Sequence, residues 1–148
     1  MSLVILLDSG PLGFVTHRGG PPEVDSCQAW LTSMRDTGCR LIVPEIADYE
    51  VRRELLRARK TAGLARLDAL SSSLEYLPIT TIAMRRAAEP WAEARRAGRP
   101  TADRHALDSD VILAAQAATM GTPDFVIATT NVAHMSRFVP AKLWTEIG

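Results

Sequence analysis

A run of five apolar residues near the amino terminus, Leu3 to Leu7, constrains the fold of this chain more than any other stretch. Asp8 follows it directly, and the breaker pair Gly10-Pro11 comes next. A short uninterrupted apolar run of this kind predicts a strand buried on both faces, as in a parallel sheet. Asp8 then lies at the carboxyl end of the strand, where open parallel sheets bind their ligands. Alternatively, Asp8 forms a turn in which it accepts a hydrogen bond from the Gly10 amide.

Apolar runs that resemble the first one alternate with helical patterns along the rest of the chain. A Gly- and Pro-rich loop is expected from Asp8 to Pro22, and Pro78 places the third strand at an edge of the sheet. Alternating strands and helices predict an α/β fold, an α/β/α sandwich around a central, mostly parallel sheet of four to five strands. The length of 148 residues fits one domain, residues 1–148. Strands are expected at 3–7, 41–43, 74–79, 125–128 and 141–144, and helices at 24–37, 45–60, 64–72, 81–98 and 111–120.

The composition excludes several classes of protein. The 17 basic and 17 acidic residues cancel, which argues against binding to duplex DNA by charge alone. Aromatic residues make up only 5% of the chain, too few for a single-strand binder built on stacking platforms. No apolar run approaches the length of a membrane span, and the first run lacks the basic flank of a signal peptide. A cytoplasmic location, with Cys27 and Cys39 as buried free thiols, is therefore expected.

Positive charge is concentrated in the middle of the chain. The segment from Arg52 to Arg104 holds twelve basic and six acidic residues, so its net charge is +6. Most of these basic residues are arginines, whose planar guanidinium matches phosphate. The segment therefore either forms a phosphate-binding surface or supplies ordinary solvated helix faces.

Four polar residues lie at the ends of the predicted elements. Asp8 ends the first strand, and Glu50 lies one turn into the helix that follows the second. Asp110 begins the helix before the fourth strand, and Asn131 comes just after that strand. Because the carboxyl ends of parallel strands meet at one edge, these side chains are expected to share one crevice. Clustered carboxylates raise one another's pKa, and Mg²⁺ or Mn²⁺ would balance them and suit phosphodiester hydrolysis.

Each of these residues also has an ordinary structural explanation. Asp110 in a first helical turn would be stabilised by the helix dipole. Asp108 is expected to be the N-cap of that helix. Glu50 could be a solvated helix residue, and Asp103 could cap the loop beside Arg104. The joint occurrence of four such groups at the ends of buried elements favours a site.

Four short motifs, in order, carry a resemblance to a known family. From residue 3 to about residue 145 the chain resembles the PIN-domain ribonucleases and is similar to toxins of the VapC type. Each motif alone is weak, but their order and spacing make the match fairly specific. The motifs are Leu6-Leu7-Asp8-Ser9, Val43-Pro44-Glu45-Ile46-Ala47-Asp48-Tyr49-Glu50, Asp110-Val111-Ile112-Leu113-Ala114-Ala115-Gln116-Ala117 and Thr129-Thr130-Asn131-Val132-Ala133-His134.

The resemblance implies a hydrolase, an endoribonuclease that depends on Mg²⁺ or Mn²⁺ and leaves 5′-phosphate and 3′-hydroxyl ends. Asp8 and Asp110 match the principal metal-binding aspartates, and Glu50 matches the acidic residue of the second motif. Asn131 would contact the scissile phosphate or the attacking water. Together Asp8, Glu50, Asp110 and Asn131 form the expected catalytic set.

One departure from the family pattern supports an alternative. His134 stands where many relatives have an aspartate, which puts a tightly held second metal in doubt. The chain could therefore be a PIN-fold module that binds RNA or protein with weak or no catalysis. A phosphatase with a phosphoryl-accepting aspartate is disfavoured, because Ser9 and Gly10 follow Asp8 where an Asp-x-Asp pair would be expected.

The resemblance also implies partners. An RNA substrate, a cognate antitoxin whose segment lies in the groove, and a homodimer through the early helices are expected, with no membrane association. The RNA target and the sequence at the cut site cannot be deduced from the chain, because recognition of looped RNA depends on surface shape.

Overall fold

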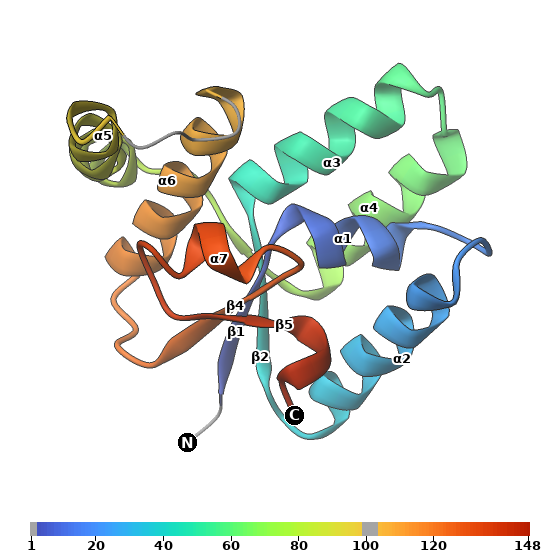
Figure 1. The fold of residues 1–148 in the computed structure, drawn as a ribbon. Coiled ribbons are helices and arrows are strands. Elements are labelled where there is room, and N and C mark those ends of the chain that lie inside the picture. Colours follow the sequence, from blue (N-terminus) through green and yellow to red (C-terminus); the bar gives the residue numbers. More distant parts are fainter. Residues whose placement is uncertain (1–2, 99–103) are drawn as a thin grey trace.

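A computed structural model describes residues 3–98 and 104–148 (Figure 1). Within these ranges five strands form one sheet in the order β3-β2-β1-β4-β5, and every pairing is parallel. The predicted α/β fold with a parallel sheet is confirmed, including the edge position of β3. The strands are β1 (Val4–Leu7), β2 (Arg40–Pro44), β3 (Glu75–Leu77), β4 (Phe125–Thr129) and β5 (Ala141–Leu143).

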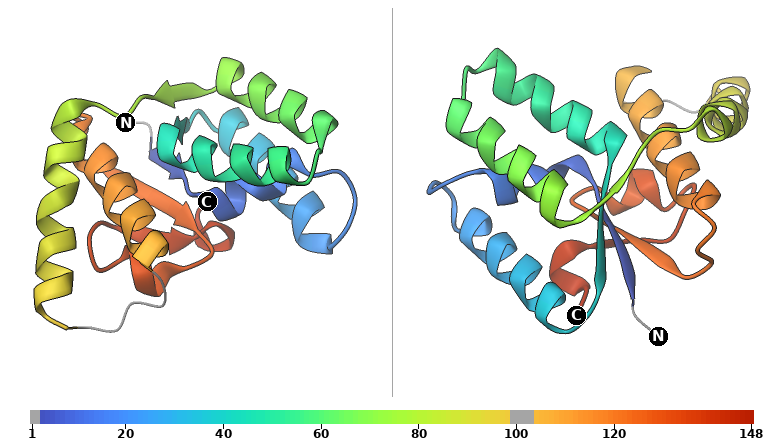
Figure 2. Two further views of the ribbon diagram at one scale, coloured as in Figure 1. Left: turned by 90° about the horizontal axis from the view of Figure 1, so that it is seen from above. Right: turned by 180° about the vertical axis from the view of Figure 1, so that it is seen from behind.

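Helices cover both faces of the sheet (Figure 2). Strand β1 serves both: Ile5 and Leu7 pack into the core beneath α1 to α4, whereas Val4 and Leu6 pack against α6 and α7. Helix α5 lies outside α6 and contacts it through small side chains. The helices are α1 (Ser9–Thr16), α2 (Pro22–Asp36), α3 (Glu45–Arg57), α4 (Thr61–Ser73), α5 (Thr81–Arg96), α6 (Arg104–Thr119) and α7 (Val132–Met135), and a 3₁₀ helix spans Trp144–Glu146.

The loop expected directly after Asp8 is instead helix α1. Asp8 is its N-cap, with the carboxylate accepting from the Ser9 amide rather than from that of Gly10. The first turn of a helix leaves its amides without helical partners, so Pro11 is accommodated there despite its missing N–H. The apolar residues Leu12 and Val15 then bury this helix against the sheet. The sequence prediction was wrong here because Gly10-Pro11 was taken for a chain break.

Helix α6 begins several residues earlier than predicted, at Arg104 instead of Val111. Leu107 extends its apolar face and is buried against α5, which explains the longer helix. Asp108 is exposed within the helix and is not its N-cap. Asp110 likewise lies well inside the helix, so the expected stabilisation by the first turn does not apply. Asp103 lies outside the described residues.

A buried glutamine connects α6 to the carboxyl edge of the sheet. Gln116 is 1% exposed; its Oε1 accepts from the Ile46 amide at 3.3 Å, and its Nε2 donates to the Leu77 carbonyl at 2.8 Å. These two bonds fix α6 against the start of α3 and the end of β3. They therefore set how the side chains of α3 and α6 face each other above the sheet.

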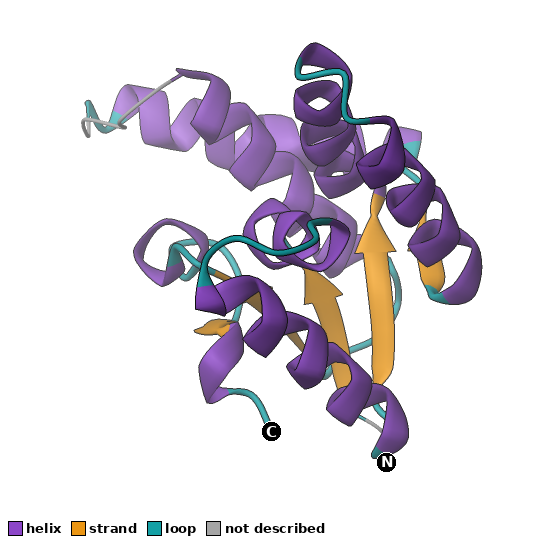
Figure 3. Cartoon of the chain, turned by 90° about the vertical axis from the view of Figure 1, so that its right-hand side faces the viewer, coloured by secondary structure: helices purple, strands orange, loops and turns teal. Residues whose placement is uncertain are grey.

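The strands of the sheet run towards one edge, where α1, α3, α6 and α7 gather (Figure 3). In the described part of the chain, no helix is long and apolar enough to cross a membrane.

Candidate active site

Asp8 lies at the centre of this edge, between the end of β1 and the start of α1. Its Oδ1 accepts from the Ser9 amide at 2.8 Å, and its Oδ2 accepts from the Thr129 hydroxyl at 2.7 Å. Burial raises the pKa of Asp8 above its ordinary value, and these two hydrogen bonds oppose the rise. Asp8 therefore caps α1 and also places a carboxylate at the edge of the sheet.

Glu50 faces Asp8 from the second turn of α3. Burial raises the pKa of Glu50, and the negative charges of Asp8 and Asp110 add to the rise. A hydrogen bond from Ser109 and the guanidinium of Arg53, 3.8 Å from Oε2, act in the opposite direction. Glu50 is thus part of the same electrostatic cluster as Asp8 and is not an ordinary solvated helix residue.

Asp110 completes the cluster from α6. Burial and the charge of Asp8 raise the pKa of Asp110 to about 6. Two cationic or titratable groups flank it: Arg137 Nη2 lies 3.8 Å and His134 Nδ1 lies 3.9 Å from Asp110 Oδ2. Asp8, Glu50 and Asp110, hereafter the acidic centre, therefore come together as the sequence predicted. Each has a raised pKa because burial and like charge are not fully compensated.

Asn131 lies just beyond β4 at the start of α7. Its amide donates to the Thr129 hydroxyl at 2.9 Å, and its side-chain Nδ2 lies 2.9 Å from His134 Nδ1. The side chain of Asn131 is linked to Asp110 through His134, and its backbone is linked to Asp8 through Thr129.

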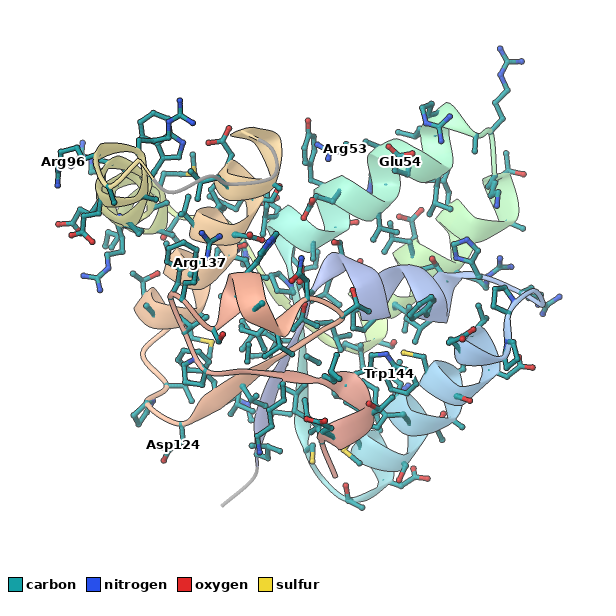
Figure 4. The ribbon with its side chains drawn as sticks, in the orientation of Figure 1. Arg53, Glu54, Arg96, Asp124, Arg137 and Trp144 are labelled. Atoms are coloured by element: carbon teal, nitrogen blue, oxygen red, sulfur yellow. The ribbon has the colours of Figure 1, made fainter. Side chains whose placement is uncertain are left out.

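Three contributors were not singled out from the sequence. Thr129 holds Asp8, Ser109 bonds to Glu50, and Arg137 flanks Asp110. Thr129 is the first residue of the fourth quoted motif and Ser109 directly precedes the third, so a check of the polar residues in and beside these motifs could have found them. Arg137 follows a short irregular segment and carried no recognisable signal. Figure 4 shows it between α6 and α7, near the centre of the molecule.

A groove with a volume of about 440 Å³ opens beside the acidic centre, between α1 and α3. Ser9, Gly10 and Glu50 line one part of it, and Arg53 and Arg57 line another. Figure 4 shows Arg53 and Glu54 on α3 along this side of the molecule. The groove gives an extended ligand access to the carboxylates.

Close packing keeps α1 and the loop after β4 together at the mouth of this groove. A Cβ atom placed on Gly10 would lie 2.7 Å from Thr130 Oγ1 and 2.9 Å from its Cγ2. The absence of a side chain at Gly10 therefore brings Ser9 and Asp8 close to Thr129.

The donor set suits a hard divalent cation, because carboxylate oxygens are the ligands that Mg²⁺ and Mn²⁺ prefer. The raised pKa values of Asp8, Glu50 and Asp110 indicate negative charge that lacks a counter-cation. Among residues 3–98 and 104–148, however, no group of three or more His, Cys, Asp or Glu side chains is arranged to hold a metal ion. The chemistry of the residues fits a cation, although their present arrangement is not a formed metal site.

Comparison with solved structures identifies the fold. A chain of VapBC2 from Rickettsia felis, bound to a promoter DNA fragment, matches with a TM-score of 0.68 and 14% identity, over 96% of this chain and 99% of that one. DNA-bound VapBC from Salmonella typhimurium matches with a TM-score of 0.64 and 22% identity, over 96% and 98%. VapBC-1 from nontypeable Haemophilus influenzae matches with a TM-score of 0.70 and 14% identity, over 97% and 100%.

At these identities the likeness establishes the fold, and the PIN-like architecture predicted from the four motifs is confirmed. No protein-family model and no curated protein matches the sequence.

Proposed function

We propose that this chain is a PIN-domain endoribonuclease that hydrolyses RNA phosphodiester bonds and depends on Mg²⁺ or Mn²⁺. The observation that carries the proposal is the convergence of Asp8, Glu50 and Asp110, with raised pKa values, at the carboxyl edge of a PIN-like sheet. Asp8 and Asp110 would hold the cation, with Glu50 as a further ligand. When bound, the cation would neutralise the phosphate and make water a better nucleophile.

The surrounding residues supply the remaining steps. Glu50 orients the attacking water and accepts its proton. The water oxygen then bonds to phosphorus in line with the leaving 3′ oxygen, whose bond to phosphorus breaks. The leaving oxygen takes a proton from solvent and so becomes the 3′-hydroxyl. The product carries a 5′-phosphate. Asn131, beside His134, and Arg137, beside Asp110, would donate hydrogen bonds to the phosphate oxygens.

We further propose that the chain is the toxin of a toxin–antitoxin pair, because the matching structures are VapBC assemblies. The antitoxin would place a segment in the groove between α1 and α3 and present a basic side chain to the acidic centre. A homodimer is the proposed assembly. Arrest of growth on expression, relieved by co-expression of a small protein encoded next to this chain, would support this.

Cleavage of RNA by the purified chain tests the catalytic proposal. Mg²⁺ or Mn²⁺ should permit cleavage and EDTA should stop it, and Asp8→Asn and Asp110→Asn should each abolish it in folded protein. Asp108→Asn is the matched control, because Asp108 is an exposed carboxylate on the same helix as Asp110. If Asp8→Asn cuts RNA as fast as the parent chain, the proposed mechanism is wrong.

A non-catalytic module that binds RNA or protein is the second candidate. His134 and Arg137 next to Asp110 favour it, because neither supplies the further anionic ligand that would be expected there. It predicts no cleavage at any concentration of Mg²⁺ or Mn²⁺, no stabilisation by these ions and no growth arrest.

A further inference from the structure

The groove beside the acidic centre adjoins a second hollow at the far end of α3. This second hollow has a volume of about 340 Å³ and lies among the ends of α1 and α3 and the start of α4. His17, Leu55 and Lys60 line both hollows, so the two lie next to each other. Figure 1 shows α1, α3 and α4 side by side on the same part of the molecule.

The second hollow, hereafter the distal basic pocket, differs in charge from the first. Arg18, Arg59, Lys60 and Arg66 line it together with His17, and none of the described residues that line it is acidic. In the first hollow, by contrast, both arginines are paired with glutamates: Arg57 with Glu54 at 2.9 Å and Arg53 with Glu50 at 3.8 Å. The charge along the groove therefore changes from acidic at the catalytic end to basic at the distal end.

The basic residues of the distal pocket also keep their charge available. Within residues 3–98 and 104–148, Arg18, Arg59 and Lys60 form no ion pair, and their side chains are exposed. Arg52, on another face of α3, is instead neutralised by Asp48 and Asp68. The basic middle segment of the sequence thus divides into arginines that stabilise the fold and a cluster with unbalanced charge.

The backbone at Arg59 supports a role for this side chain. Arg59 has φ +54°, the left-handed conformation that ends α3 and that glycine adopts without strain. Among the described residues, Arg59 is the only non-glycine residue with a positive φ. An arginine at such a position gives up stability that glycine would provide, which suggests a use outside the fold.

We propose that the distal basic pocket binds backbone phosphates of a single-stranded RNA whose scissile bond lies at the acidic centre. This inference rests on the proposed function and deepens it. Three carboxylates repel a polyanion, so the affinity for RNA must come from positive charge elsewhere along the strand. The distal basic pocket, which adjoins the groove, provides that charge. None of the described residues that line the pocket is Phe, Tyr or Trp, so it holds phosphates and does not stack bases.

Binding of a labelled single-stranded oligouridine tests the proposal in the full chain. All proteins carry Asp8→Asn, so that the probe is not cut. Lys60→Ala and Arg18→Ala should each weaken binding, and each should reduce the slope of log K against log salt by about 0.7, the value for one lost phosphate contact on a single strand. Arg35→Ala, on an exposed arginine of α2 that lines neither hollow, should leave affinity and slope unchanged. Oligodeoxythymidine should show the same differences, because phosphate contacts do not depend on the sugar.

Two substitutions at Arg59 separate binding from folding. Arg59→Gly should raise the melting temperature while it weakens oligouridine binding, so that the two effects have opposite signs. Arg59→Lys should retain most of the binding, because the charge remains.

Outcomes for the pocket and for the enzyme can be told apart. If the parent chain cuts RNA but the Lys60, Arg18 and Arg59 variants bind with unchanged affinity and slope, the pocket inference is overturned, and an acidic segment of a protein partner becomes the better ligand for this cluster. If the parent chain does not cut RNA but oligouridine binding still depends on these residues, the proposed catalysis fails and the pocket stands.

Discussion

Helix α3 carries two carboxylates in opposite electrostatic settings. Asp48 is 8% exposed, and two partners compensate its negative charge. Tyr76 donates a hydrogen bond to Oδ2 at 2.7 Å, and Arg52 lies 3.1 Å from Oδ1. Glu50, two residues later, faces Asp8 and Asp110, whose charges oppose its own. The cluster of Asp48, Arg52, Asp68 and Tyr76 holds α3 to α4 and β3, whereas the acidic centre is held in place without being neutralised.

The difference separates a structural carboxylate from a functional one. A buried charge that is paired and hydrogen-bonded contributes to the fold, and removing one partner is costly. A buried charge that is left with like-charged neighbours lowers the stability of the empty protein, and this is useful only if a ligand supplies the missing positive charge. Substitutions in the cluster around Asp48 and in the acidic centre should therefore have opposite effects on the stability of the empty protein. The following experiments test this difference and its counterpart in catalysis.

The largest difference is expected in catalysis. Asp8→Asn should reduce Mg²⁺-dependent RNA cleavage by more than about 100-fold, because even residues that only orient metal ligands contribute 10- to 100-fold. Asp48→Asn should leave the rate per folded molecule close to that of the parent. Initial rates on a fluorogenic RNA, with circular dichroism to verify folding, measure both. An equal loss of activity in the two variants would contradict the distinction between the acidic centre and the cluster around Asp48.

The stability of the metal-free protein should depend on pH through Asp110. Its pKa is raised from 3.8 to about 6, so the native state binds this proton more tightly than the unfolded chain does. The protonated form therefore contributes stability at low pH, and the contribution disappears as pH rises from about 4 through 6. The full loss is about 3 kcal/mol.

Asp110→Asn should accordingly stabilise the metal-free protein at pH 7 and flatten the change between pH 4 and 7, as measured by urea unfolding in EDTA. Asp108→Asn, on the same helix, is the control and should leave the profile of the parent. A steep profile that persists in Asp110→Asn would place the titrating group elsewhere.

The opposite change in stability is expected for Asp48, whose substitution should destabilise the protein. Asp48→Ala leaves the Tyr76 hydroxyl and the Arg52 guanidinium without their partner, and should lower the free energy of unfolding by about 2 kcal/mol. Urea unfolding at pH 7 measures it. Glu54→Ala on the exposed surface of α3 should change stability by less than about 0.5 kcal/mol. Stability of Asp48→Ala equal to that of the parent would show that this cluster does not hold the helix.

The acidic centre and the cluster around Asp48 also differ in how far they could be predicted from the sequence. Asp8 and Glu50 were predicted because strand ends and the following helix are local features, set by apolar periodicity. Asp110 was predicted at the site but assigned to the wrong part of its helix, since burial of Leu107 against α5 depends on tertiary packing. The paired state of Asp48 depends on Tyr76 in β3 and Arg52 one turn away. Tyr76 is distant in sequence and leaves no local signal, and neither does Arg137, whereas the i, i+4 spacing of Asp48 and Arg52 is local.

Thr129 provides the finest test, because it touches only one carboxylate of the acidic centre. Its hydroxyl donates to Asp8 Oδ2 and accepts from the Asn131 amide, and its side chain is fully buried. Thr129→Val keeps the shape but removes both bonds, so Asp8 loses its orientation and cleavage should fall about 10-fold. Loss of a bond that lowers the pKa of Asp8 should also move the acid limb of the pH–rate profile to higher pH. Thr129→Ser, which restores the hydroxyl, should recover both the rate and the profile; if it behaves like Thr129→Val, the effect of residue 129 is packing alone.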